Sequence, residues 1–324
     1  MTGTATQLAR TVDTAMLAQR DEKKTVRKFW LQKAEEHAGK GTASTPLYFT
    51  LPGAAATEVN MLIAAGLIKM EENGAIHKDS AHALVCLEYD QKVYLEIQRK
   101  YSGLKIIRAN VEEFIHGNSR IRFPTGEQEK YCRSKVVNLD LNETWSPKFI
   151  QDDALVPVLT WIQKFGAMHE RDPRVEWSLL LTLHGECPWD DQQANLMQHT
   201  LLEILSDTSE CREQLKQWLG EEVFDQITSG GFTGFRTLQR DIQQKLLMWL
   251  VPAMISEQCH KQGWAISVAK NLYYGSEPVA PMVTWVIDFS RTEQKLNYRA
   301  EHNTCLKTIL NNTGFINPDG TISH

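Results

Sequence analysis

Residues 264–289, WAISVAKNLYYGSEPVAPMVTWVIDF, decide the fold of this chain of 324 residues. Two runs rich in apolar, aromatic and β-branched residues, 264–272 and 281–289, predict two strands. The segment between them contains Gly275 and Pro278 and is too short to hold a crossover helix. The two strands are therefore expected to pair as an antiparallel hairpin that closes the domain.

The chain before this hairpin alternates short apolar runs with amphipathic segments. Five of the runs predict strands, at residues 47–51, 83–87, 104–107, 136–140 and 177–183. Strands that alternate with helices form right-handed βαβ units in a mostly parallel sheet, and nearly continuous apolar strands need helices on both faces. The sequence thus predicts an α/β, Rossmann-like fold with a mostly parallel seven-stranded sheet and a C-terminal antiparallel hairpin.

The remaining segments set the expected domain organisation. Residues 1–44 predict an N-terminal helical extension, of which residues 1–20 are a tail or a loosely held helix. One Rossmann-like domain is expected at residues 45–290, with a helical insertion at about 192–260. Residues 291–324 predict a C-terminal helix and a polar tail.

Composition excludes few partners. A formal net charge of −5, with 42% hydrophobic and 23% charged residues, is typical of a globular protein and leaves room for a local basic patch. No apolar run approaches the roughly 20 residues that span a bilayer, and no signal-peptide core is present, so we expect a cytoplasmic protein without a membrane segment. The six scattered cysteines form no C-x-x-C pair, so neither a metal site nor a disulfide framework is expected.

The order of the predicted elements resembles that of the class I S-adenosylmethionine-dependent methyltransferases, whose seven-stranded sheet carries a reversed last strand beside the sixth. The resemblance covers residues from about 45 to 290, and it is one of element order more than of motif. It implies S-adenosylmethionine as the cofactor. In such folds the ligand lies at the carboxyl ends of the strands, where a turn of small residues lets the backbone approach it.

The resemblance assigns cofactor roles to two strand ends. The turn after the first strand implies contacts from Pro52, Gly53 and Ala54. The acidic residue and the second and third glycines of the family's loop are missing here, so the alternative is a tight strand-to-helix turn. After the second strand, Glu88, rather than Asp90, is implied as the acceptor of hydrogen bonds from the two ribose hydroxyls. The alternative is a pair of solvated loop acids.

Polar residues also follow the third and fifth strands. Asn110 and Glu112 resemble the stretch where the family places a polar side chain against the adenine amino group. The alternative for Glu112 is a place in the first turn of a helix, where the dipole favours a carboxylate. His184, after the fifth strand, is either a general base near neutral pH or an ordinary loop residue.

The fourth strand ends in NLDLNETWSP, residues 138–147. This stretch resembles the Asp-Pro-Pro type of signature found in enzymes that methylate amino groups of nucleic-acid bases. The resemblance implies that Asp140 and Asn142 hold an amine and that Trp145 stacks on an extruded base. Both prolines expected in the signature are missing, and Leu141 stands in the place of the first.

Two functions of different classes remain open. The first is an S-adenosylmethionine-dependent methyltransferase acting on an amino group of a nucleic-acid base; the sulfonium is already activated, so the protein mainly binds, orients and excludes water. The second is a catalytically degenerate subunit of the same fold that acts as a binding or assembly partner in a larger complex. The eroded first turn and the altered fourth-strand motif favour the second. A nucleic-acid or a protein partner is expected accordingly, and the sequence leaves the oligomeric state open.

Overall fold

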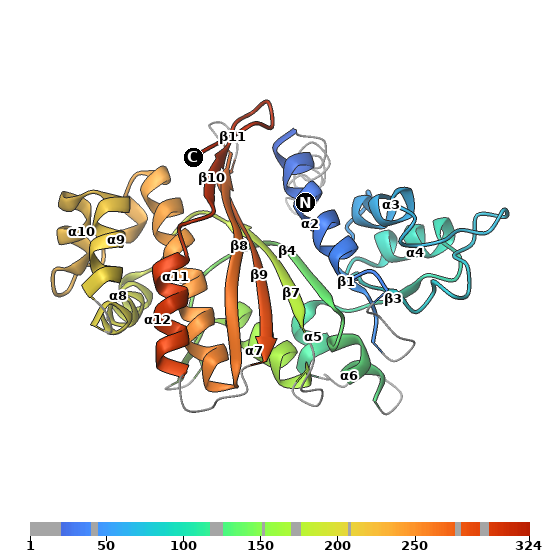
Figure 1. Ribbon diagram of the computed structural model, residues 1–324, viewed down its shortest axis with the longest axis horizontal. Helices are drawn as coiled ribbons and strands as arrows, with labels where there is room; N and C mark the ends of the chain where they lie inside the picture. Colours follow the sequence, from blue (N-terminus) through green and yellow to red (C-terminus); the bar gives the residue numbers. More distant parts are fainter. Residues whose placement is uncertain are drawn as a thin grey trace, which may run out of the picture. The chain divides into compact units, whose positions relative to one another are not determined.

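The computed structural model describes residues 21–39, 45–116, 126–150, 153–169, 176–206, 209–275, 280–291 and 298–324. The tail predicted at residues 1–20 lies outside them. The described strands include a nine-stranded sheet of order β11-β10-β8-β9-β7-β4-β1-β2-β3 (Figure 1). The bounds of its strands are β1 (Tyr48–Thr50), β2 (Leu84–Leu87), β3 (Lys105–Ile107), β4 (Val136–Thr144), β7 (Trp177–His184), β8 (Trp264–Tyr274), β9 (Met282–Arg291), β10 (Thr313–Ile316) and β11 (Ile322–Ser323).

All seven predicted strands are present, as β1 to β4 and β7 to β9, but the prediction of a seven-stranded sheet was wrong. The two additional strands, β10 and β11, lie in the segment that the sequence predicted as a polar tail. β10 pairs in parallel with β8, for example Gly314 with Leu272, and its Ile316 is fully buried. A strand of four residues carries too few side chains for a period-two pattern to stand out among polar neighbours.

The direction of each strand follows from the length of its connections. β1 pairs in parallel with β2 and with β4, and β2 pairs in parallel with β3. β9 runs antiparallel to both of its neighbours, β7 and β8, because the connection between Tyr274 and Met282 is too short for a crossover. The mostly parallel sheet with its C-terminal antiparallel hairpin is therefore confirmed.

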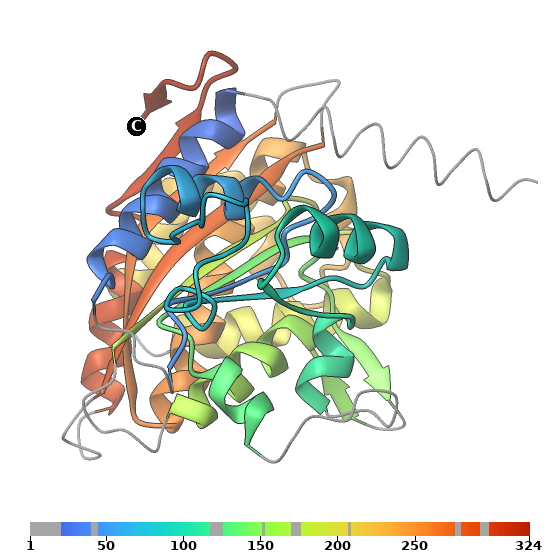
Figure 2. The same ribbon diagram turned by 90° about the vertical axis from the view of Figure 1, so that its right-hand side faces the viewer.

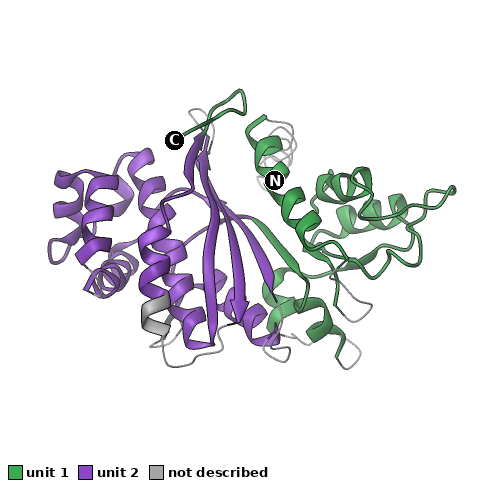
Figure 3. Ribbon diagram, in the orientation of Figure 1, with its two compact units in different colours: residues 1–140, 316–323 green, residues 141–315, 324 purple. Residues whose placement is uncertain are grey.

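The chain divides into two compact units, and the division falls inside β4 (Figure 3). Unit 1 comprises residues 1–140 and 316–323, and unit 2 comprises residues 141–315 and 324. Helix α2 (Asp21–Glu36), predicted as part of an N-terminal extension, belongs to unit 1 together with β1, β2 and β3.

In unit 1, helices lie on both sides of β1, β2 and β3. Figures 1 and 2 show α3 (Thr57–Ala64) and α4 (Gln91–Lys100) on one side, and α5 (Val111–His116) and α6 (Glu127–Cys132) on the other. The chain leaves β1 towards β2 and β3 and then returns to place β4 on the opposite flank of β1. The strand order thus reverses between β1 and β4. In open α/β sheets, ligands bind outside the carboxyl ends of the strands at such a reversal.

In unit 2, the long helix α11 (Arg240–Lys261) packs along β8 and against three other helices, α7 (Pro157–His169), α9 (Ser209–Leu219) and α12 (Tyr298–Thr308). The segment predicted as a helical insertion ends with α11 and contains α8 (Asp191–Ser206), α9, α10 (Glu221–Thr228) and the 3-10 turn η1 (Gly234–Thr237). A separate small hairpin joins β5 (Lys148–Ile150) to β6 (Asp153–Leu155). Across the described ranges, no helix combines the length and the apolar character needed to cross a bilayer.

Gly275, directly after β8, is required for the closing hairpin. Its φ is +94°, and a Cβ at this position would lie 2.3 Å from the carbonyl oxygen of Ala280. We expect Gly275→Ala to lower the free energy of unfolding by about 2–3 kcal/mol, because backbone strain and a steric clash act together. Gly231→Ala is the matched control, since Gly231 has a φ of +80° but no atom within 4 Å of its Cβ position. It should cost only about 1–2 kcal/mol in urea denaturation, and equal losses would contradict a role for the clash.

Candidate functional site

The loop after β1 contains the small residues that were predicted to approach a cofactor. Pro52 is buried, whereas Gly53 and Ala54 are exposed, and a Cβ on Gly53 would meet no atom within 4 Å. Gly53 has a φ of +58° and Ala56 a φ of +44°. Among the residues that the structure describes, Ala56 is the only non-glycine with a positive φ, which costs an L residue roughly 1–2 kcal/mol. Because such strain clusters at functional sites, this loop is a candidate binding element.

The carboxyl end of β2 places an acid beside this loop. Thr50 on β1 pairs with Cys86 on β2, so Pro52 and Glu88, each two residues further on, reach the same edge of the sheet. Glu88 is partly buried, and its Oε1 accepts a hydrogen bond of 2.8 Å from the backbone N–H of Asp90. Burial raises the pKa of the Glu88 carboxyl, an effect that this hydrogen bond opposes.

Asp90, the other acid after β2, has a structural role. Its Oδ1 accepts hydrogen bonds from the backbone N–H groups of Lys92 and Val93 in the first turn of α4, at 2.8 and 3.0 Å, and it is the N-cap of that helix. Glu88 is therefore the acid left at the edge. Tyr89, between the two acids, is 67% exposed.

The end of β3 leads into a capping box. Oδ1 of Asn110 accepts a bond of 2.7 Å from the N–H of Glu113, and Oε2 of Glu113 accepts one of 3.2 Å from the N–H of Asn110. This reciprocal pair stabilises the start of α5. Glu112 is exposed in the first turn of the same helix, where the helix dipole favours a carboxylate. Both residues thus have a position that the helix start explains without a ligand.

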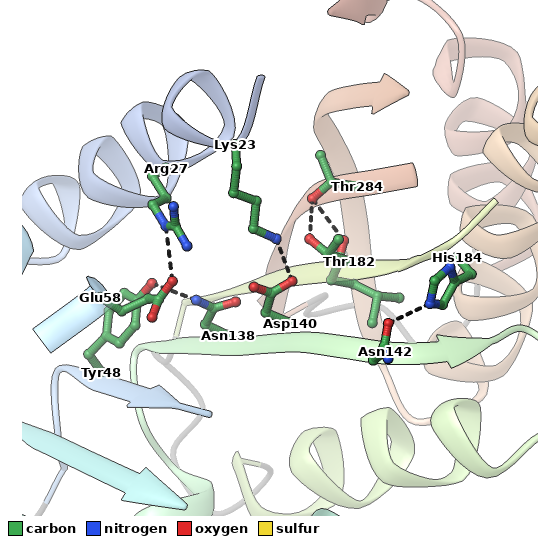
Figure 4. A network of polar contacts seen from close by, with 11 residues as sticks. Lys23, Arg27, Tyr48, Glu58, Asn138, Asp140, Asn142, Thr182, His184 and Thr284 are labelled. Carbon is green, nitrogen blue, oxygen red and sulfur yellow. Dashed lines mark hydrogen bonds and ion pairs between the residues drawn. The ribbon is translucent and has the colours of Figure 1, made fainter. Parts of the chain in front are cut away.

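The middle of β4 is bound by the N-terminal helix. Nζ of Lys23 on α2 lies 2.5 Å from Oδ1 of Asp140, and the two side chains are 11% and 23% exposed (Figure 4). Nδ2 of Asn138 donates a hydrogen bond of 3.1 Å to the hydroxyl oxygen of Tyr48 on β1. Alternate residues of a strand project from one face, so Asn138 and Asp140 lie on the same side of β4. Asp140, which was predicted to hold a substrate amine, binds the ammonium of Lys23.

A second ion pair joins α2 to the start of α3. Nε of Arg27 lies 3.1 Å from Oε1 of Glu58, and the side chains are only 10% and 4% exposed. Neither residue was among the predicted catalytic or cofactor-binding residues. The sequence did contain two weak signals: Lys23 and Arg27 are spaced to share one helix face, and Glu58 stands in a first helical turn. However, the paired residues are 117 and 31 positions apart in the chain, so no local pattern reveals the pairing.

Burial dominates the electrostatics of this edge cluster, which consists of Lys23, Arg27, Tyr48, Glu58, Asn138 and Asp140. Desolvation raises the pKa of the Glu58 carboxyl, and the Arg27 guanidinium opposes that shift. Burial, reinforced by the charge of Glu58, also raises the pKa of the Tyr48 phenol, which keeps it protonated. Within the described residues, Oδ1 of Asn138 and Oγ1 of Thr50 on β1 are buried without a hydrogen-bond partner. Buried polar atoms of this kind cost free energy until water or a ligand pairs with them.

The other two predicted catalytic residues belong to unit 2. Asn142 is exposed, and its Oδ1 lies 2.5 Å from Nε2 of His184 at the end of β7 (Figure 4). Because an amide oxygen only accepts, Nε2 carries the hydrogen, and the neutral ring keeps a lone pair on Nδ1. Trp145 is completely buried; its indole N–H lies 3.4 Å from Sδ of Met254, and its carbonyl accepts a bond of 2.7 Å from the indole of Trp189. A ring enclosed in this way presents no exposed face to a base.

His184 should titrate below the ordinary range of a histidine. Burial lowers its pKa from 6.5, although Glu186 and Glu143 oppose the shift. The unfolded chain then binds the proton of His184 more readily than the folded chain does. The contribution of the neutral ring to the free energy of unfolding is therefore fully present above pH 6.5 and is lost as the pH falls through the folded pKa. Titration by nuclear magnetic resonance should give a pKa below 6.5, and His184→Gln should make stability less sensitive to acidification over that window. A pKa at or above the ordinary value would contradict this.

Across the described segments, no group of three or more His, Cys, Asp or Glu side chains is placed to hold a metal ion. No protein-family profile matches the sequence, and no curated protein matches it. The strand order and the residues at the carboxyl edge of unit 1 are therefore the basis for assigning a function.

Proposed function

We propose that unit 1 binds S-adenosylmethionine at the carboxyl ends of β1 and β2, and that the chain is a methyltransferase. The observation that carries this proposal is the strand order β3-β2-β1-β4-β7-β9-β8, in which β9 is reversed between β7 and β8. A seven-stranded sheet with a reversed last strand beside the sixth is the arrangement implied by the resemblance to class I methyltransferases. β10 and β11 extend that arrangement beyond β8.

The residues at the edge fit a ligand that contains a ribose. The exposed Gly53 and Ala54 allow the backbone to approach the ligand closely. Glu88 follows β2 at the level of this loop, and the two oxygens of a carboxylate can accept hydrogen bonds from two neighbouring hydroxyls. When bound, the cofactor supplies an activated methyl group. The residues of the chain then have to bind, orient and exclude water.

Asp140 is the residue of unit 1 that is best suited to orient an acceptor amine. It lies on β4, which pairs directly with β1, and its carboxylate already binds the nitrogen of Lys23. A carboxylate that accepts a hydrogen bond from an amine fixes the direction of the nitrogen lone pair. We therefore propose an amino group, such as that of a nucleic-acid base, as the methyl acceptor.

A second candidate is a methyltransferase-fold subunit that no longer catalyses methyl transfer and acts as a binding or assembly partner. Three observations favour it. Asp140 is engaged by Lys23, Asn110 caps a helix, and Trp145 is enclosed in the core of unit 2. This candidate predicts that S-adenosylmethionine does not bind.

Calorimetric titration with S-adenosylmethionine separates the two candidates. The wild-type chain should bind, and Glu88→Ala should weaken binding at least tenfold, because hydrogen bonds to a charged group contribute about 1.5–3 kcal/mol. Glu96→Gln, which changes an exposed acid on α4, is the matched control and should bind like the wild type. Equal affinity of Glu88→Ala and the wild type would remove Glu88 from the site. No binding by the wild type would contradict the methyltransferase proposal and favour the binding or assembly subunit.

A further inference from the structure

Helix α2 presents different cations to unit 1 and to solvent. Lys23 and Arg27 are buried against Asp140 and Glu58, whereas Lys24 and Lys28 on the same helix are exposed. The buried pair is spaced four residues apart and lies on one helix face. α2 therefore places the charges of Lys23 and Arg27 at the carboxyl edge of unit 1.

These charges lie where the proposed ligands would bind. Asp140 is on β4, next to β1, and Glu58 is in the first turn of α3, directly after the loop of Gly53 and Ala56. One ion pair thus fixes the end of that loop, and the other occupies the carboxylate proposed to orient an amine (Figure 4). While Oδ1 of Asp140 accepts the contact of 2.5 Å from Nζ of Lys23, part of the acceptor capacity of this carboxylate is taken from an incoming amine.

The attachment of α2 is poorly suited to permanent docking. Of the seven residues that it buries, four are charged or polar (Glu22, Lys23, Thr25 and Arg27) and three are apolar (Val26, Trp30 and Ala34). Removing charges from water costs free energy, and the attraction within a buried ion pair offsets this cost only in part. A helix held in this way is expected to open separately from the strands beneath it.

We propose that α2 (Asp21–Glu36) is a latch on the carboxyl edge of unit 1, which detaches as a unit and must detach before a ligand binds against the loop after β1 and beside Asp140. The latch is a property of the free chain; only the identity of its ligand rests on the proposed function. When a binding-competent state is only partly populated, the apparent dissociation constant rises by the inverse of that fraction. Weakening the latch should therefore tighten binding.

The first test needs no ligand. Hydrogen exchange of the full chain in low concentrations of urea should show the amides of α2 exchanging at least tenfold faster than those of β1 and β4. Lys23→Gln should accelerate exchange in α2, and exchange there should depend less steeply on urea than exchange in β1 and β4. Lys24→Gln removes an exposed charge from the same helix and should change nothing. If α2 exchanges only together with β1 and β4, or responds equally to both variants, the latch is overturned.

The second test is a calorimetric titration with S-adenosylmethionine. Lys23→Gln should bind it at least tenfold more tightly than the wild type, and Lys24→Gln should bind it like the wild type. Equal affinity in all three proteins would overturn the latch and leave the methyltransferase proposal standing. If none of the three binds, the proposed function fails, and hydrogen exchange alone decides whether the latch exists.

Discussion

Arg27→Met is expected to lower the free energy of unfolding by about 3–5 kcal/mol, because it leaves the carboxylate of Glu58 buried without its guanidinium. The Glu58 side chain is only 4% exposed and lies 3.1 Å from Arg27. The ion pair itself contributes much less than this to the free energy of unfolding, because the desolvation of both charges on folding offsets most of their attraction. The double variant Arg27→Met/Glu58→Leu should therefore recover most of the stability. Urea denaturation of the two single variants and the double variant measures the coupling.

The loss in Arg27→Met should also depend on pH. Burial raises the pKa of Glu58 above 4.5 even beside Arg27, and removing the guanidinium takes away the effect that opposes this rise. A carboxyl with a raised folded pKa favours the folded state below the unfolded pKa and loses that contribution as the pH rises through the folded pKa. The variant should therefore approach wild-type stability as the pH falls from neutrality. Equal losses in the single and double variants, or no dependence on pH, would contradict a buried ion pair.

Trp145→Ala is the second substitution with a large expected effect. Its ring is completely buried in unit 2, with its indole N–H near Met254, so truncation should leave a cavity and cost about 3–5 kcal/mol of unfolding free energy. A residue that only stacked on a base would lose substrate binding and keep its stability. Thermal denaturation without any ligand distinguishes these roles. Tyr89→Ala is the control, because Tyr89 is 67% exposed and should change stability by no more than about 0.5 kcal/mol.

The fold could be predicted because its decisive signals are local. Apolar runs predict the seven central strands, and the short connection between β8 and β9 determines the direction of β9. β10 was not predicted, because its four residues lie in a polar segment and form a strand only through pairing with β8. Such pairing is a tertiary effect, and a short run cannot signal it.

The site could be predicted only in part, for a related reason. The small residues at Gly53 and the acid at Glu88 stand at strand ends, and the parallel pairing of β1 and β2 brings them to one edge. Lys23 and Arg27 could not be assigned, because their partners become neighbours only when α2 docks on unit 1. Similarly, the sequence could not show that Trp145 faces the core, since aromatic residues serve packing and recognition alike.

The most direct test of the account is a crystal structure of the full chain grown with saturating S-adenosylmethionine. We predict that the cofactor lies at the carboxyl ends of β1 and β2, with its ribose hydroxyls bound to Glu88 and its chain against the loop of Gly53 and Ala54. Cofactor bound elsewhere on the chain, or an edge that stays empty at saturation, would contradict the account.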